Sequence, residues 1–114
     1  MRSSGRSDLS VDVAARVDDR VALTFVGEID STNAEIVDSF LTRALAVEDP
    51  PREVVLEMSG VTFIDSNGLS VLVRHRRAVG RTVSIVIENP ADHLRRLLEI
   101  TALDALFELR PASI

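Results

Sequence analysis

The chain has 114 residues, of which 46% are hydrophobic and 27% are charged, and its formal net charge is −5. These proportions are typical of one globular domain of ordinary size. No apolar run approaches the roughly 20 residues that cross a bilayer, and the N-terminus lacks the apolar segment of a signal peptide. Cysteine is absent, which excludes disulfides and cysteine-ligated zinc. We therefore expect a cytoplasmic protein with no membrane partner.

The basic residues argue against a nucleic-acid partner. All 13 are arginine, they are outnumbered by 18 acidic residues, and the chain contains no Trp or Tyr. A nucleic-acid binder is usually basic on at least one face. Arg74, Arg76, Arg77 and Arg81 do cluster, but a solvated helix flank accounts for them. We expect the protein to bind no nucleic acid.

Two short strands are predicted near the N-terminus. Apolar residues alternate with polar or small ones over residues 9–14 and again over residues 21–25. The Asp-Asp-Arg sequence at residues 18–20 predicts a turn, so the two strands should form an antiparallel hairpin. Residues 1–8 are mostly small and polar, and we expect them to be a disordered tail.

A helix should follow the second strand. Ser31, Thr32 and Asn33 are candidate N-caps, and Thr32 with Glu35 three residues later fits a capping box. Pro50-Pro51 cannot continue a helix and leads the chain into the next strand. An apolar stripe at helical spacing is formed by Ile36, Phe40, Leu41, Ala44 and Leu45. A strand, a helix and a strand of this length imply parallel pairing with a right-handed crossover.

The stretch after the two prolines is the most informative part of the sequence. Val54–Met58 fits a buried strand, and residues 59–64 read as a short connection. Asp65-Ser66-Asn67-Gly68 is small and polar, and a helix is predicted from about Ser66 to Val79, with Gly80 just beyond its end. This arrangement places the Ser66 hydroxyl at a helix N-terminus near the carboxyl end of a strand, where open sheets hold their functional loops.

The C-terminal third should complete a small α/β domain. Residues 82–87 are rich in β-branched side chains and predict a fourth strand. Asn89 and Pro90 predict the N-cap and the first residue of a third helix, whose buried face would be Leu94, Leu97 and Leu98. A short last strand is predicted around residues 106–107. We expect one domain over residues 9–110, with a mixed sheet of four to five strands and three main helices, and a short tail over residues 111–114.

Three motifs in order resemble the STAS domain family, the anti-sigma factor antagonists. Residues 63–69, FIDSNGL, resemble the family pattern of an apolar pair, Asp-Ser, Ser or Thr, and Gly-Leu-Gly. Residues 27–30, GEID, resemble a second signature, and residues 94–103, LRRLLEITAL, resemble the end of the family's third helix. The resemblance covers nearly the whole chain, from Leu9 to Leu109, and implies the STAS (anti-sigma factor antagonist-like) fold.

The resemblance also implies a protein switch. In such families the unmodified antagonist binds an anti-sigma factor that is itself a serine kinase, and this frees the sigma factor. The kinase phosphorylates the serine after the motif aspartate, the complex dissociates, and a metal-dependent serine phosphatase restores the active form. Carried over by position, the phosphoacceptor is Ser66. The implied partner-binding surface consists of Asp30, Thr32, Asn33, Asp65, Ser66, Asn67 and Ser70.

The sequence departs from the family pattern at three positions. Asn67 stands where Ser or Thr is usual, so a second hydroxyl acceptor is missing, although asparagine suits the same turn. Ser70 replaces the last glycine of Gly-Leu-Gly, where a partner would approach closely. Ala102 replaces a common glycine near the end of the third helix, which we interpret as structural. None of these changes removes Ser66.

Two less specific interpretations of the motif stay open. Ser66 could serve only as an N-cap, and Asp65 is an equally good candidate with Ser66 just inside the helix. A non-switching STAS subunit or scaffold of a transporter or stress-sensing complex would keep the same fold and could keep the serine.

The oligomeric state is a separate question. An exposed edge at the first strand leaves it open between a monomer and a weak homodimer.

An enzyme is the third alternative, and the sequence argues against it. A serine hydrolase needs a base within hydrogen-bond reach of its serine, and residues 65–68 are not a Gly-x-Ser-x-Gly elbow. His75 lies about two and a half turns along the same predicted helix as Ser66. We expect His75 and His93 to face solvent, and we expect no catalytic residue, cofactor or metal ligand.

Overall fold

A computed structural model of the chain describes residues 8–111. The tails expected at residues 1–8 and 111–114 lie almost entirely outside the described residues. Within residues 8–111, five strands form one sheet in the order β1-β2-β3-β4-β5. β1 is antiparallel to β2, and the other neighbouring strands are parallel. The elements are β1 Leu9–Val13, β2 Arg20–Ile29, α1 Ala34–Leu45, β3 Glu53–Ile64, α2 Ser66–Val79, β4 Ser84–Glu88, α3 Asp92–Ile100, a 3₁₀ turn Leu103–Ala105, and β5 Glu108–Arg110.

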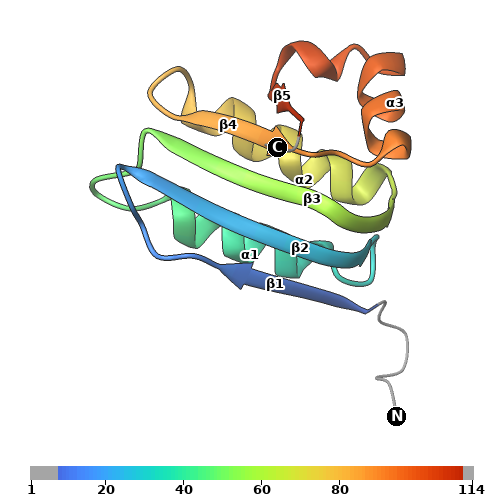
Figure 1. The fold of residues 1–114 in the computed structure, drawn as a ribbon, viewed down its shortest axis with the longest axis horizontal. Helices are drawn as coiled ribbons and strands as arrows, with labels where there is room; N and C mark the ends of the chain where they lie inside the picture. The colour runs from blue at the N-terminus through green and yellow to red at the C-terminus, as the bar shows by residue number, and fades with distance from the viewer. Residues whose placement is uncertain (1–7, 112–114) are drawn as a thin grey trace.

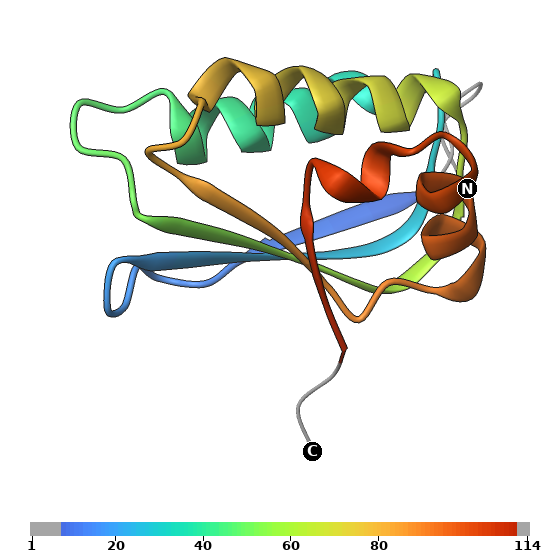
Figure 2. The same ribbon diagram turned by 90° about the horizontal axis from the view of Figure 1, so that it is seen from above.

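The helices cover one face of the sheet. Figure 2 shows α1 and α2 side by side above the strands, with α3 and the 3₁₀ turn near the N-terminal end of α2. Apolar side chains from β2, β3 and β4 meet those of the helices in one core, in which Phe25, Leu56 and Ile87 are fully buried. The predicted mixed sheet with three main helices is confirmed.

The hairpin forms as its sequence predicts. Asp18 and Asp19 both adopt positive φ angles, 52° and 62°, which is the backbone that a tight two-residue hairpin turn requires. Gly27 lies opposite Leu9 at the other end of the β1–β2 pair with a φ of 126°. A Cβ there would lie 2.3 Å from the Asp8 carbonyl oxygen, so this position needs glycine.

β3 is longer than predicted. The expected connection over residues 59–64 is strand, because it pairs with an equally extended β2 through Val26–Gly60 and Ile29–Ile64. Two register shifts in that pairing accommodate the turn-forming residues that made the segment resemble a loop. As a result the strand leads directly into Asp65, and the polar motif sits at the very end of the sheet (Figure 1).

Two boundaries near the C-terminus were predicted wrongly. Asn89 is not the N-cap of α3: it adopts a φ of 56° and donates its backbone N–H to the Arg110 carbonyl oxygen at 2.6 Å, so it joins β4 to β5. The helix begins two residues later than predicted, at Asp92 after the N-cap Ala91. The last strand is residues 108–110, because the chain first makes the 3₁₀ turn and buries Phe107.

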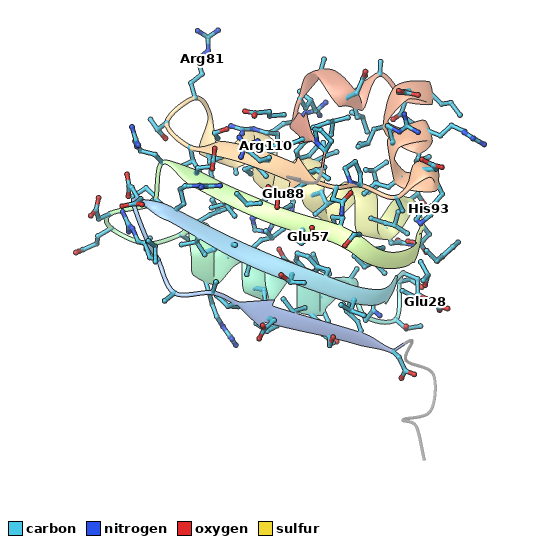
Figure 3. The ribbon with its side chains drawn as sticks, viewed as in Figure 1. Glu28, Glu57, Arg81, Glu88, His93 and Arg110 are labelled. Carbon is cyan, nitrogen blue, oxygen red and sulfur yellow. The ribbon has the colours of Figure 1, made fainter. Side chains whose placement is uncertain are left out.

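The other face of the sheet carries charged side chains. Glu57, Glu88 and Arg110 occupy neighbouring register positions on β3, β4 and β5 (Figure 3). Glu53 accepts a hydrogen bond from Arg20 Nε at 2.5 Å and another from Arg110 Nη2 at 3.2 Å. Burial alone would raise the pKa of Glu53, but these two arginines outweigh it and lower the pKa. The pairs link β2, β3 and β5.

Candidate functional site

The polar motif and the loop after β2 meet at the carboxyl ends of two neighbouring strands. Ile29 and Ile64 are register partners at the last positions of β2 and β3. The backbone N–H of Asp65 donates to the Ile29 carbonyl oxygen at 3.1 Å, which continues the strand pairing by one residue. Asp30 and Asp65 therefore begin adjacent loops on one edge of the molecule.

Asp65 is the N-cap of α2. Its Oδ1 accepts the backbone N–H groups of Asn67 at 2.9 Å and Gly68 at 3.1 Å, so two otherwise unpaired amides of the first turn are satisfied. Ser66 is the first helical residue, and it is exposed. Among the residues that the structure describes, none forms a hydrogen bond with its hydroxyl. The interpretation of Ser66 as merely an N-cap is therefore wrong.

Gly68 brings the helix close to the strands. A Cβ at this position would lie 2.5 Å from Ile29 Cγ2 and 2.9 Å from Ile64 Cγ1, both in the packed end of the core. The absence of a side chain lets the first turn of α2 sit directly on β2 and β3. This close packing fixes the height and direction of Ser66 above the sheet.

The loop after β2 is held by its own polar side chains. Asp30 Oδ1 accepts the Thr32 backbone N–H at 2.9 Å and the Thr32 hydroxyl at 2.6 Å. Asn33 is completely buried: its Nδ2 donates to the Glu28 carbonyl oxygen at 2.8 Å, and its Oδ1 accepts the Asp30 N–H at 3.0 Å. The loop thus presents Thr32 outward and is shaped from inside by Asn33.

The start of α1 differs from the predicted capping box. The helix begins at Ala34, and its N-cap is Asn33 rather than Thr32. The Asn33 side chain makes no capping bond, because its amide is used inside the loop that precedes the helix. The Asp30 carbonyl oxygen accepts the Ala34 N–H at 2.9 Å instead.

A shallow groove of about 470 Å³ runs along α2 from Ser66. We call it the α2 groove. It is lined by Ser66, Leu69, Ser70, Val73, Arg74, Arg77 and Leu103. The hydroxyls lie at one end and the arginines at the other, with apolar side chains between them. Arg74 is paired with Asp38 of α1, Nη2 to Oδ1 at 2.8 Å, whereas Arg77 is exposed on α2 without an ion pair in the described chain.

Two residues near Ser66 were not singled out as site residues by sequence reasoning. Phe63, one position before the end of β3, is 48% exposed, which is unusual for an aromatic side chain beside a buried core. Exposed aromatic residues are frequent anchors of protein interfaces. Leu103 reaches the α2 groove from the 3₁₀ turn, and no local pattern predicts this because it depends on the path of the chain after α3.

The two histidines make structural contacts. His75 Nε2 lies 2.6 Å from Asp38 Oδ1, and its side chain is only 13% exposed, so the expectation that it faces solvent is wrong. The His75 side chain is largely covered because α1 packs beside α2 and places Asp38 next to it. The bond from His75, with that from Arg74, lowers the pKa of Asp38 below its ordinary value. His93 is exposed as expected, with Nε2 3.0 Å from the Val61 carbonyl oxygen.

Residues 8–111 contain neither a candidate membrane-spanning helix nor a candidate metal site. No helix in this part of the chain is long and apolar enough to cross a membrane. No group of three or more His, Asp or Glu side chains in the same residues is arranged to hold a metal ion.

A comparison of the sequence with known protein families identifies the family of this chain. The model of the STAS domain matches residues 12–113, which is most of the chain. The chain belongs to the STAS domain family. In this chain GEID lies at the end of β2, FIDSNGL spans the junction of β3 and α2, and LRRLLEITAL lies in α3 and the turn after it.

Several anti-sigma factor antagonists are similar to this chain over most of their length. The anti-sigma-B factor antagonist of Listeria monocytogenes is 30% identical over 106 residues, covering 90% of this chain and 90% of that protein. The anti-sigma-F factor antagonist RsfB of Mycobacterium tuberculosis is 29% identical over 87 residues, covering 76% of this chain and 70% of that protein. The crystal structure of an anti-sigma factor antagonist from Mycobacterium paratuberculosis superposes with a TM-score of 0.82 at 26% identity, covering 92% of this chain and 87% of that one.

Proposed function

We propose that this STAS protein is an anti-sigma factor antagonist, whose unphosphorylated form binds an anti-sigma factor with serine kinase activity and releases the sigma factor that it held. The names of the similar Listeria and mycobacterial proteins support the class of partner. The observation that carries the proposal is that Ser66 is exposed and is not needed to cap the helix. Ser66 is the first residue of α2, and Asp65 is the N-cap.

The proposed docking surface lies around that serine. Thr32, Asn67 and Ser70 are exposed there, and Asp30 and Asp65 are half-buried. Asn33 is also part of the proposal, but as the buried residue that shapes the loop rather than one that contacts the partner. The exposed ring of Phe63 and the apolar floor of the α2 groove add area that a partner could cover.

Phosphorylation of Ser66 would change this surface without breaking the fold. A phosphate adds about −1.5 to −2 charges at neutral pH. The positive end of the α2 dipole favours it by roughly 0.3–1 kcal/mol at an exposed site. Asp65 and, across the adjacent loop, Asp30 oppose it by like-charge repulsion. A partner packed against Ser66 would meet both the bulk and the charge, so the complex dissociates. A metal-dependent serine phosphatase then restores binding.

A binding experiment with two Ser66 variants tests the switch. Each anti-sigma kinase from the same genome is titrated calorimetrically with wild type, Ser66→Ala and Ser66→Glu, and Arg96→Gln on the exposed face of α3 serves as the matched control. One kinase should bind wild type, Ser66→Ala and the control alike, and should bind Ser66→Glu at least about 100-fold more weakly, because a buried unpaired charge costs several kcal/mol at an interface. Equal binding of Ser66→Glu would favour a non-switching scaffold.

A further inference from the structure

A second hollow lies at the opposite end of the fold from Ser66. It is about 400 Å³ in volume and is formed where the β1–β2 hairpin faces the C-terminal half of α1. We call it the hairpin groove. It is lined by Val13, Ala14, Ala15, Arg16, Val21, Leu23, Phe40, Arg43, Ala44, Val47 and Pro51. Ligand pockets typically measure about 300–1,000 Å³.

The lining of the hairpin groove is apolar and open to solvent. Val13 is 50% exposed and Val47 is 46% exposed at its rim, while Leu23 at its floor is buried in the core. Val17, in the turn of the same hairpin, is 62% exposed. These side chains give the hairpin groove an apolar floor and an apolar rim.

One of the two arginines in the groove is neutralised and fixes its shape. Arg16 is paired with Asp19 in the hairpin, and its Nη1 donates to the Asp49 carbonyl oxygen at 2.6 Å in the loop after α1. The Asp49 carboxylate lies 3.8 Å from the same guanidinium. These contacts hold the hairpin against the loop after α1, so this end of the groove is formed by contacts within the protein itself.

The other arginine carries an uncompensated charge. Within the described chain Arg43 forms no ion pair, and its guanidinium lies over the Phe40 ring, 5.4 Å from the ring centroid. None of the residues that line the groove is acidic. The hairpin groove therefore combines an apolar floor with one free cation held in position at its side, within a protein whose net charge is −5.

We propose that the hairpin groove binds a small anionic amphiphile, a medium-chain carboxylate. Its alkyl chain would lie against Val13, Leu23 and Val47, and its carboxylate would pair with Arg43. The charge of Arg43 selects an anionic head group, and the volume fits a single short chain. This site is separate from the proposed switch at Ser66 and does not depend on it.

Amide NMR titration of the full chain tests the proposal. Sodium decanoate should give saturable shifts confined to the amides of residues 13–16, 21–23 and 40–47. Octanoate should bind roughly tenfold more weakly, since each buried methylene is worth about 0.8 kcal/mol. Decyltrimethylammonium, which has the same chain and the opposite charge, should bind at least about tenfold more weakly because Arg43 repels it.

Variants locate the charge that is responsible. Arg43→Gln should weaken decanoate binding by roughly fivefold, as expected for a partly exposed ion pair of about 1 kcal/mol. Arg96→Gln, an exposed arginine on α3, should leave it unchanged. The proposal is overturned if decanoate shows no saturation up to about 1 mM, if Arg43→Gln binds as tightly as wild type, or if the shifts gather around Ser66. The first of these results would instead be expected if the groove served a protein partner.

Discussion

At the scale of single residues, the Ser66 side chain differs from the carboxylates and the buried amide beside it, because it forms no hydrogen bond within residues 8–111. Asp65 satisfies the first amides of α2, Asp30 holds Thr32, and Asn33 is buried in the loop before α1. A change at any of these three would disturb the loops themselves. The Ser66 hydroxyl can be modified or removed while the loops keep their bonds, which is what a switch residue requires.

Ala102 carries backbone strain that glycine would relieve. It follows α3 with a φ of 59°, in the left-handed region where an L-residue is disfavoured by roughly 1–2 kcal/mol. Glycine has more freedom to lose on folding, about 0.4–1 kcal/mol. We predict that Ala102→Gly raises the free energy of unfolding by roughly 0.5–1 kcal/mol in urea denaturation. Ala78→Gly, at an exposed position of α2, should lower it by about 1 kcal/mol. Destabilisation by Ala102→Gly would contradict this account of the turn.

At the scale of elements, the contact between α1 and α2 holds the helix that carries Ser66. Asp38 on α1 accepts from Arg74 Nη2 at 2.8 Å and lies 2.6 Å from His75 Nε2, both on α2. The carboxylate therefore joins the two helices. Its pKa is lowered first by the bond with His75 and then by the bond with Arg74.

This pair predicts a definite pH dependence. A carboxyl whose pKa is lowered in the folded state contributes stability that is fully present above its unfolded pKa of about 3.9 and is lost as the pH falls through the folded value. Asp38→Asn should therefore lower the free energy of unfolding at pH 7 by roughly 0.2–1 kcal/mol, a small effect because the side chain is 41% exposed. Denaturation curves at pH 7 and pH 3 measure it. A difference from wild type that grows toward pH 3 would show that the bonds to Asp38 do not stabilise the fold.

At the scale of the whole molecule, the proposed docking surface and the hairpin groove lie at opposite ends of the sheet. The proposed docking surface lies at the carboxyl ends of β2 and β3, and the hairpin groove lies where β2 begins. The core and the α1–α2 pair lie between them. The first turn of α2 packs on Ile29 and Ile64 through Gly68, and Ser66 is exposed, so a phosphate on Ser66 would point away from the core.

We predict that phosphorylation leaves the fold unchanged. In amide NMR spectra of the phosphorylated and unphosphorylated chain, shifts should be confined to the loops that begin at Asp30 and Asp65 and to the first turn of α2. The amide signals of the buried residues of β3 and β4 should coincide in the two spectra, because the added charge is solvated at the helix end. Shifts throughout the sheet would mean that the switch works by refolding.

Local patterns predicted most of this architecture. Period-2 alternation identified the hairpin, and the Asp-Ser-Asn-Gly sequence with Gly80 predicted both ends of α2 correctly. Those signals are properties of a few neighbouring residues, so the sequence contains them directly. The adjacency of Asp30 and Asp65 followed from parallel pairing of β2 and β3, which the length of the crossover implied.

What the sequence could not predict depends on contacts between distant residues. Residues 59–64 contain turn formers and become strand only because β2 extends beside them. Asn89 resembles an N-cap, but the Arg110 carbonyl oxygen 21 positions later accepts its N–H. His75 lies among arginines in the sequence, and Asp38 on another helix determines its orientation. Leu103 and the α2 groove depend in the same way on the packing of the 3₁₀ turn.

The most direct test of the central claim is intact mass spectrometry after incubation with ATP and each anti-sigma kinase from the same genome. Wild type should gain the mass of one phosphate, and Ser66→Ala should gain none, while Ser70→Ala, one turn along the same helix, should be phosphorylated like wild type. No phosphate from any kinase that binds the chain would contradict the switch. Phosphate that persists in Ser66→Ala would place the acceptor at another hydroxyl.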